Sequence, residues 1–246
     1  MKGYRNNTKL FLLLVGGGKS LRMNLDVPKP FLFLEGKPIF VRAIEPFQEA
    51  YPDIKVVVIL PYSYLELGER YIQEYCTYPQ NISVISGGES RTLSVWNGLT
   101  YLHRQGVVHK YKSLVAIHDA ARPLLTPHLV KKTFFSANTY DSGISVVPIA
   151  FAIRKKNKCR SYAIDREKYW EVQTPQVFNF SQIWEAYQNH YQQSFYDDAT
   201  LYEEDGFIAK EVTGEVTNIK VTYPHDFAIA CHLWKLQQQN TENEAR

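Results

Sequence analysis

The stretch KLFLLLVGGGKSLRMNLDVPKP, residues 9–30, decides the fold of this chain. Residues 10–15 are an unbroken apolar run, which is typical of a buried strand. The run stops at Gly16, Gly17 and Gly18, where the backbone can approach a ligand closely and offer consecutive N–H donors to an anion. Arg22 and Lys29 add two positive charges to the same loop. The stretch therefore predicts a loop that holds the phosphates of a nucleotide.

Two familiar phosphate-binding motifs resemble this loop, and neither fits it. Gly18, Lys19 and Ser20 suggest the end of a P-loop, but Leu13 stands where that motif requires its first glycine. The dinucleotide-binding fingerprint fails because Leu21 occupies its third glycine position. From the glycines alone, a surface turn flanked by two solvated cations remains an equal alternative.

The length suits one large domain or two small ones, and we expect a single globular domain over residues 1–246. Hydrophobic residues make up 45% of the chain and charged residues 22%, which is enough for a substantial core. The net charge of +3 is small, so nothing indicates a nucleic-acid or membrane partner. Without a span-length apolar run or a secretory signal, we expect a cytoplasmic protein. Cys76, Cys159 and Cys231 are far apart in sequence, as expected of reduced thiols.

Strand patterns alternate with helix patterns along the chain, which predicts an α/β sandwich with a mainly parallel central sheet. We expect strands at 10–15, 55–60, 81–85, 113–117, 143–149, 208–212 and 218–221. We expect helices from 38, with Pro46 kinking or shortening the first, and at 62–75, 90–105, 127–138, 180–191, 198–204 and from 224. Residues 150–174 are basic and irregular, and predict an excursion from the core; the tail beyond Gln237 is expected to fray.

Two further loops that follow predicted strands carry useful chemistry. The first holds Gly88, Arg91 and Ser94 around a helix N-terminus, an arrangement that favours an anion. A plain N-cap at Ser90 beside a solvated arginine is the commoner interpretation of such a segment alone. Because the carboxyl ends of parallel strands meet at one edge of a sheet, we expect this loop and the glycine loop to share a ligand.

The second loop begins with His118 and Asp119 at the end of a predicted strand. A carboxylate there suits a Mg²⁺ ligand or a ribose contact, although a lone aspartate at a strand end is more often a turn or cap residue. His118 is expected to be a packed or orienting residue, since no partner histidine lies at helical spacing. Asp197 and Asp198 are interpreted mainly as the N-cap of the following helix.

Five motifs, in order, resemble the 2-C-methyl-D-erythritol 4-phosphate cytidylyltransferases of the non-mevalonate isoprenoid pathway. They are GGGxxxRM followed by PK, GGxxRxxSVxNGL, HDAARP, DR before QTPQVF, and NIKVT before a proline and Asp226. The resemblance covers about residues 9–230. It implies a Rossmann-like nucleotidyltransferase core, a homodimer that exchanges the arm at about 150–174, CTP and a polyol phosphate as substrates, and Mg²⁺ as cofactor.

The resemblance also implies roles for individual residues. CTP would be bound by Gly16, Gly17, Gly18, Gly88, Arg91, Ser94 and Asp119, with Asp119 also at the metal. The catalytic cations would be Arg22, Lys29, Arg166 and Lys220, with Arg166 acting across the dimer interface. The acceptor would be bound by Arg122, Arg166, Thr174 and Lys220. These roles agree with the chemistry, because an ionised phosphate nucleophile needs positioning and charge stabilisation more than a base.

One departure from the family pattern concerns the acceptor. Phe151 and Ala152 stand where many members carry an Asp-Thr pair, while Arg154 keeps a cation. Two alternatives therefore stay open. One is transfer to another polyol phosphate, such as ribitol 5-phosphate, and the other is a nucleotide-binding module without catalysis.

Overall fold

The computed structural model describes residues 8–17, 28–106 and 112–244. Its centre is a seven-stranded sheet in the order β11-β7-β10-β6-β1-β4-β5. From one edge to the other, the strands are β11 (Glu211–Thr213), β7 (Ser142–Pro148), β10 (Trp170–Asn179), β6 (Ser113–Asp119), β1 (Lys9–Val15), β4 (Lys55–Leu60) and β5 (Ile82–Ser86). Neighbouring strands are parallel except for β10, which is antiparallel to both β6 and β7.

Strand β1 lies inside the sheet because its apolar run feeds two cores. Successive side chains of a strand point to opposite faces. Leu12 and Leu14 accordingly pack in one core with residues of α1, α2 and α4, and Leu13 packs in the other with residues of α3, α5 and α6. All three leucines are fully buried. A strand buried on both faces needs a continuous apolar sequence, which residues 10–15 provide.

Seven α-helices and four short 3₁₀ helices are present in the described part of the chain. The α-helices are α1 (Ile39–Ala50), α2 (Leu65–Tyr75), α3 (Arg91–Arg104), α4 (Pro127–Tyr140), α5 (Phe180–His190), α6 (Asp198–Glu204) and α7 (Pro224–Glu244). The 3₁₀ helices are η1 (Lys29–Phe31), η2 (Tyr62–Tyr64), η3 (Pro79–Asn81) and η4 (Arg166–Lys168). None of the helices among these residues is both long and apolar enough to cross a bilayer.

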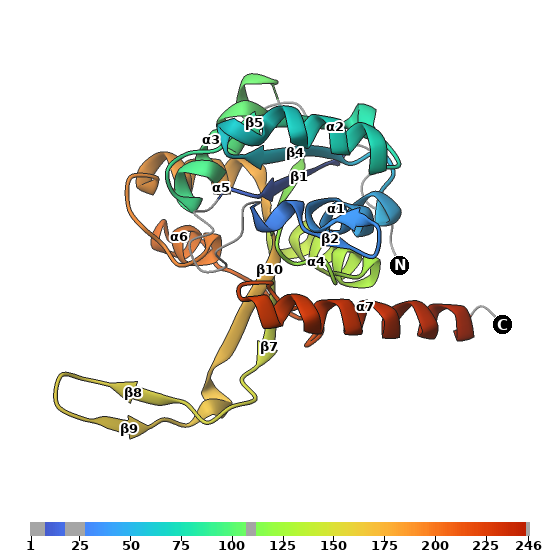
Figure 1. Cartoon of the computed structure of the whole chain (residues 1–246). Coiled ribbons are helices and arrows are strands. Elements are labelled where there is room, and N and C mark those ends of the chain that lie inside the picture. The colour runs from blue at the N-terminus through green and yellow to red at the C-terminus, as the bar shows by residue number, and fades with distance from the viewer. Residues whose placement is uncertain (1–7, 18–27, 107–111, 245–246) are drawn as a thin grey trace.

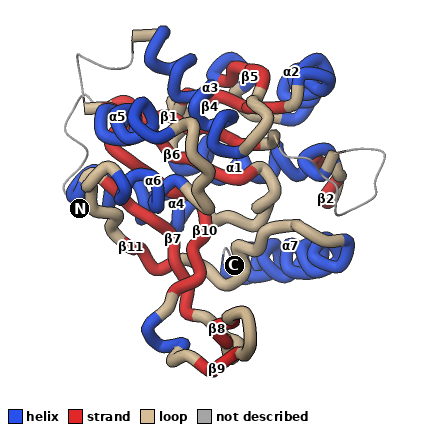
Figure 2. Tube along the Cα trace, turned by 90° about the vertical axis from the view of Figure 1, so that its left-hand side faces the viewer, coloured by secondary structure: helices blue, strands red, loops and turns tan. Residues whose placement is uncertain are grey.

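Residues 149–169 form an arm that projects from the body of the molecule (Figures 1 and 2). Its tip is an antiparallel hairpin of β8 (Arg154–Lys156) and β9 (Ser161–Ala163). Nearly all side chains of the arm are exposed. A second small hairpin, β2 (Phe33–Leu34) and β3 (Lys37–Pro38), turns at Glu35 and Gly36, both with positive φ.

Most expected elements are confirmed, and five expectations differ from the structure in detail. The excursion ends earlier than Thr174, because β10 begins at Trp170 and inserts into the sheet. Residues 218–221 form no ladder; Val221 instead donates its N–H to the carbonyl oxygen of Ala121. Helix α1 runs past Pro46, so this proline does not shorten it, and α7 continues beyond Gln237 instead of fraying. The strand expected at 208–212 is β11, shifted toward the C-terminus.

Candidate active site

Three loops meet at the carboxyl edge of the parallel strands. Gly16 follows β1, Gly87 follows β5, and Asp119 is the last residue of β6. The N–H of Gly16 donates to the carbonyl of Ile59 (2.8 Å), and the N–H of Gly87 donates to the carbonyl of Leu60 (2.8 Å). Each loop thus continues its ladder by one bond, which confirms that the loops share one edge.

The glycine loop and the second glycine pair both pack against Ser94 in the first turns of α3. A Cβ atom on Gly17 would lie 3.1 Å from the Ser94 Oγ, and one on Gly87 would lie 2.9 Å from it. A side chain at either position would crowd the Ser94 hydroxyl. The Ser94 hydroxyl accepts from the N–H of Gly88 (3.1 Å) and donates to the carbonyl of Ser90 (2.8 Å), so it fixes the second loop.

Asp119 is the centre of a group of cations. Its carboxylate lies 2.7 Å from the Nζ of Lys220, 3.2 Å from the Nε of Arg91 and 3.8 Å from the Nε of Arg122. The Asp119 side chain is 9% exposed. Burial acts to raise its pKa, but Arg91, Lys220 and Arg122 outweigh burial and hold the pKa well below its usual range. The carboxylate is therefore ionised at every working pH.

The backbone of Asp119 is held by a chain of buried hydrogen bonds through Thr174 and His118. The Asp119 N–H donates to the Thr174 Oγ1 (3.1 Å), which lies 2.9 Å from the Nδ1 of His118. Burial lowers the pKa of His118 to about 3, so the ring is neutral. Its Nε2 lies 3.3 Å from the Arg122 carbonyl, which can only accept. Nε2 therefore carries the proton, the Thr174 hydroxyl donates to Nδ1, and His118 is the orienting residue that we expected.

The segment 218–222 brings further cations to the same edge. Lys29 Nζ donates to the carbonyl of Thr222 (2.6 Å), and Arg122 Nη1 donates to the carbonyl of Asn218 (2.7 Å). The Nδ2 of Asn218 donates to the carbonyl of Thr174 (2.8 Å). Lys220 lies between these anchors. The structure thus joins three of the predicted cations, Lys29, Arg122 and Lys220, through one short segment.

Arg91 is paired with two carboxylates and is not simply a solvated cation, and Asp198 is not the cap of α6. Arg91 lies between two carboxylates, those of Asp119 and Asp198. Asp197 caps α6 by accepting from the N–H of Thr200 (2.8 Å), so the N-cap interpretation is right for Asp197 and wrong for Asp198. Sequence reasoning missed Asp198 as a partner of Arg91. The sequence did contain a signal for this pair. One aspartate is enough to cap a helix, so the second aspartate could be expected to have another partner.

The remaining predicted residues lie elsewhere. Arg166 is exposed on the arm, where it donates to the carbonyl of Ala150. Arg154 is also exposed and is bonded to the Oγ (3.0 Å) and the carbonyl (2.8 Å) of Ser161 within the hairpin. Phe151 is 82% exposed. Gly18 and Arg22 lie outside the described residues.

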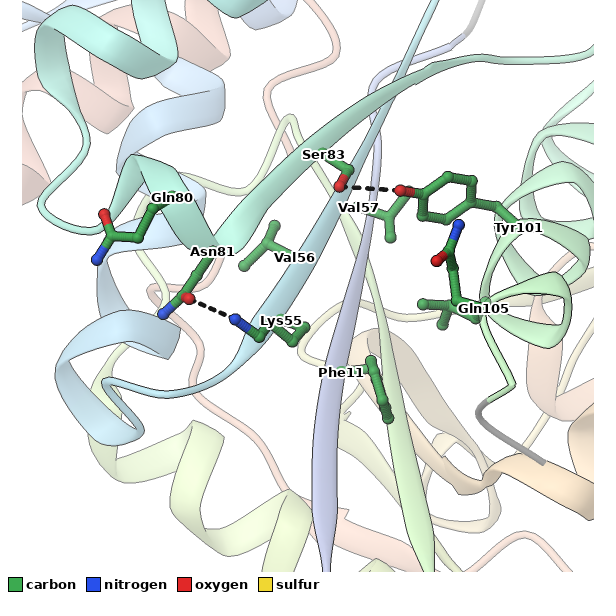
Figure 3. Close-up of a pocket in the computed structure, with 10 residues that line it drawn as sticks. Phe11, Lys55, Val56, Val57, Gln80, Asn81, Ser83, Tyr101 and Gln105 are labelled. Atoms are coloured by element: carbon green, nitrogen blue, oxygen red, sulfur yellow. Dashed lines mark hydrogen bonds between the residues drawn. The ribbon is translucent and has the colours of Figure 1, made fainter. Parts of the chain in front are cut away.

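A cavity of about 280 Å³ lies at the opposite edge of the sheet (Figure 3). Lys55, Asn81 and Ser83, at the amino ends of β4 and β5, line it together with Tyr101. The Lys55 Nζ donates to the Asn81 Oδ1 (2.6 Å), and the Tyr101 hydroxyl donates to the Ser83 Oγ (3.1 Å). These four polar side chains are thus paired with one another, and no residue that lines the cavity belongs to the Asp119 cluster.

Comparison with known proteins agrees with the family resemblance of the five sequence motifs. The family model described as 2-C-methyl-D-erythritol 4-phosphate cytidylyltransferase matches residues 10–235. Proteins of that name from Phocaeicola vulgatus and Porphyromonas gingivalis are 36% and 35% identical to this chain. The alignments cover 89% and 90% of this chain, and 96% of each relative.

Solved structures agree with the sequence comparison. The crystal structure of 2-C-methyl-D-erythritol 4-phosphate cytidylyltransferase from Thermus thermophilus superposes with a TM-score of 0.71 at 25% identity. The superposition covers 91% of this chain and 98% of that one. The 4-diphosphocytidyl-2C-methyl-D-erythritol synthase from Anaerococcus prevotii, at 20% identity and a TM-score of 0.77 over 93% of this chain and 99% of that one, shares the fold. The chain therefore belongs to the 2-C-methyl-D-erythritol 4-phosphate cytidylyltransferase family.

Proposed function

We propose that this protein transfers CMP from CTP to 2-C-methyl-D-erythritol 4-phosphate and releases pyrophosphate. Family membership supports the reaction. The observation that carries the proposal is the ionised Asp119 at the carboxyl edge of the sheet, with Lys220, Arg91 and Arg122 around it. That grouping suits a reaction in which two phosphate-bearing substrates must be brought together.

The chemistry is a displacement at phosphorus. An oxygen of the acceptor phosphate forms a bond to the α-phosphorus of CTP, and the bond from that phosphorus to the bridging oxygen breaks. Pyrophosphate leaves with the electron pair. The acceptor oxygen is already ionised, so the cations Lys29, Lys220 and Arg122 would position the two phosphates and stabilise the charge that shifts to the leaving group.

We propose Mg²⁺ as the cofactor, with Asp119 as its protein ligand. The residues fit, because Mg²⁺ in nucleotide sites is typically held by one or two carboxylates plus substrate phosphates. Within the described residues, no three or more His, Cys, Asp or Glu side chains form a ready-made metal site, so the nucleotide would supply the other ligands. When bound, Mg²⁺ would neutralise part of the phosphate charge.

We also propose that two copies of the chain exchange their arms, so that Arg166 of one chain serves the acceptor site of the other. Arg166 makes its contact within the arm and does not join the Asp119 cluster. Phe151 and Trp170 are 82% and 52% exposed, and such side chains are suited to an interface. We propose a cytoplasmic location, and the three free cysteines are consistent with such a reducing compartment.

Transfer to another polyol phosphate is a second candidate, and the absence of a hydroxyl at Ala152 favours it. The test measures pyrophosphate release from CTP and Mg²⁺ with 2-C-methyl-D-erythritol 4-phosphate or ribitol 5-phosphate, and with UTP or ATP in place of CTP. Release with the first acceptor and CTP alone is expected. Release with ribitol 5-phosphate alone would change the acceptor, and CTP binding without release would indicate a non-catalytic module.

A further inference from the structure

Asp198 is a fully buried carboxylate that binds Arg91 in a fork. It is the first residue of α6 and has 0% exposure. Arg91 Nη1 lies 3.0 Å from its Oδ1, and Arg91 Nη2 lies 2.7 Å from its Oδ2. Two parallel N–H to oxygen bonds of this kind fix the direction of the guanidinium as well as its distance. Charge and geometry together therefore hold Arg91 in one orientation.

The carboxylate itself is held by its surroundings. The Tyr187 hydroxyl on α5 donates to its Oδ1 (2.5 Å). The backbone N–H groups of Asp198 and Ala199 both donate to the Oε1 of Gln176 on β10, at 3.1 and 2.9 Å. The start of α6 is thereby attached to the central sheet. Asp198 is a rigid anchor whose only described charged partner is Arg91.

The other side of Arg91 faces the Asp119 cluster. Its Nε donates to the Asp119 Oδ1 (3.2 Å), so the two carboxylates use three of the five guanidinium N–H donors. The Arg91 side chain is 26% exposed, and two of its N–H donors are not used by either carboxylate. Asp198 also supplies counter-charge. Without Asp198, the Nη1 and Nη2 groups of Arg91 could instead bind the Asp119 carboxylate, which is the proposed Mg²⁺ ligand.

We propose that Asp198, oriented by Tyr187, is a positioning residue for CTP binding that acts through Arg91. This inference rests on the proposed function, because it places Arg91 at the nucleotide. Asp198 touches no substrate in this scheme. It holds the Arg91 guanidinium beside Asp119 and prevents a second bond to that carboxylate. Capping cannot explain Asp198, because Asp197 already caps α6.

The test uses the same substitution at two adjacent positions. Asp198→Asn keeps the size of the side chain and removes the charge that orients Arg91. Asp197→Asn keeps a good capping residue and touches no guanidinium. We expect Asp198→Asn to weaken binding of CTP with Mg²⁺, measured by calorimetry without acceptor, by about tenfold or more, equivalent to about 1.4 kcal/mol. Asp197→Asn should bind within about twofold of wild type.

A double-mutant cycle separates positioning from a general structural effect. If Asp198 acts through Arg91, then Arg91→Gln and the combined Arg91→Gln/Asp198→Asn variant should have the same CTP dissociation constant. Independent effects that multiply in the double variant would overturn the proposal. Tyr187→Phe removes one donor to Asp198 and should weaken CTP binding by about threefold, which serves if Asp198→Asn fails to fold.

The outcomes distinguish this inference from the proposed function. Wild-type protein that binds CTP and releases pyrophosphate, with Asp198→Asn equal to Asp197→Asn in CTP affinity, would overturn the role of Asp198 alone. Wild-type protein that neither binds CTP nor releases pyrophosphate would overturn the proposed function and this inference together. Circular dichroism and thermal melting of every variant confirm that affinities are compared between folded proteins.

Discussion

The Asp119 cluster and the arm differ in what holds their charged residues. At the sheet edge, Asp119 is 9% exposed and takes its charged contacts from α3, from Arg122 in the loop after β6 and from segment 218–222 of the same chain. On the arm, Arg166 is exposed and bonds within the arm itself. The cluster is organised by one chain alone. Arg166 on the arm does not reach the Asp119 cluster of its own chain. The proposed exchange of arms between two chains would require this arrangement.

The same contrast applies to energies. Charges that are removed from water interact strongly, whereas exposed pairs contribute about 0–1 kcal/mol. The arm pair of Lys168 and Asp165 is separated by 3.6 Å, with side chains 77% and 54% exposed. We therefore expect substitutions in the cluster to change rate or stability in each chain. Substitutions on the arm should matter only where the arm meets another molecule.

The largest effect is expected for Asp119→Asn. This variant removes the charge that gathers Lys220, Arg91 and Arg122 and the proposed metal ligand. We expect the turnover rate to fall by about 1000-fold. Steady-state pyrophosphate release at saturating CTP measures it. Turnover within tenfold of wild type would contradict the central place of Asp119.

Lys220→Met should follow with a loss of about 100-fold in turnover. The Lys220 side chain is 44% exposed, so its removal should leave the melting temperature nearly unchanged. Lys131→Met, an exposed lysine on α4, is the matched control. Equal turnover of the two variants would show that Lys220 serves only as a surface partner of Asp119.

Thr174→Val tests the support beneath the cluster. Valine keeps the shape but leaves the Asp119 N–H and the His118 Nδ1 without their partner. We expect a loss of about 1–3 kcal/mol in the free energy of unfolding, measured with urea. Thr139→Val, which removes an exposed hydroxyl bond to Phe135, should cost less than about 0.5 kcal/mol. Similar losses in both variants would refute the proposed support.

The smallest effect is expected on the arm. Asp165→Asn weakens an exposed pair with Lys168 and should change the free energy of unfolding by less than about 0.5 kcal/mol. Asparagine still accepts from the N–H of Glu167, as Asp165 does now. Urea unfolding beside wild type provides the measurement. A loss above 1 kcal/mol by the same scale would mean that the arm is packed more tightly than its exposure indicates.

The fold was predictable where the local pattern was strong. Residues 10–15 and 55–60 are apolar on both faces, and both form central strands. The start of strand β10 was not predicted, because Trp170, Glu171 and Val172 directly follow a basic segment and do not form an apolar run. Their side chains are exposed in the structure. Its place between β6 and β7 depends on pairing between distant strands, which local patterns do not encode.

The candidate site divides in the same way. Glycine pairs and an aspartate at the end of a strand can be recognised from the local sequence. In the structure, these residues meet at the carboxyl edge of the sheet: Gly16, Gly17, Gly88 and Asp119. The bond between Arg91 and Asp198 spans 107 residues, and neither residue has a local signal for the other. Such pairs depend on tertiary packing and become visible only in the structure.

Complementation between two inactive variants tests the shared site most directly. Arg166→Ala lacks the arm cation, and Lys29→Ala lacks a cation of the body; each alone should lose about 100-fold in turnover. After the two proteins are unfolded together and refolded as an equal mixture, a hybrid pair would contain one intact site. The mixture should then recover about a quarter of wild-type activity if subunits pair at random in symmetric dimers. Activity no higher than that of the separate variants would show that Arg166 does not serve the site of a second chain.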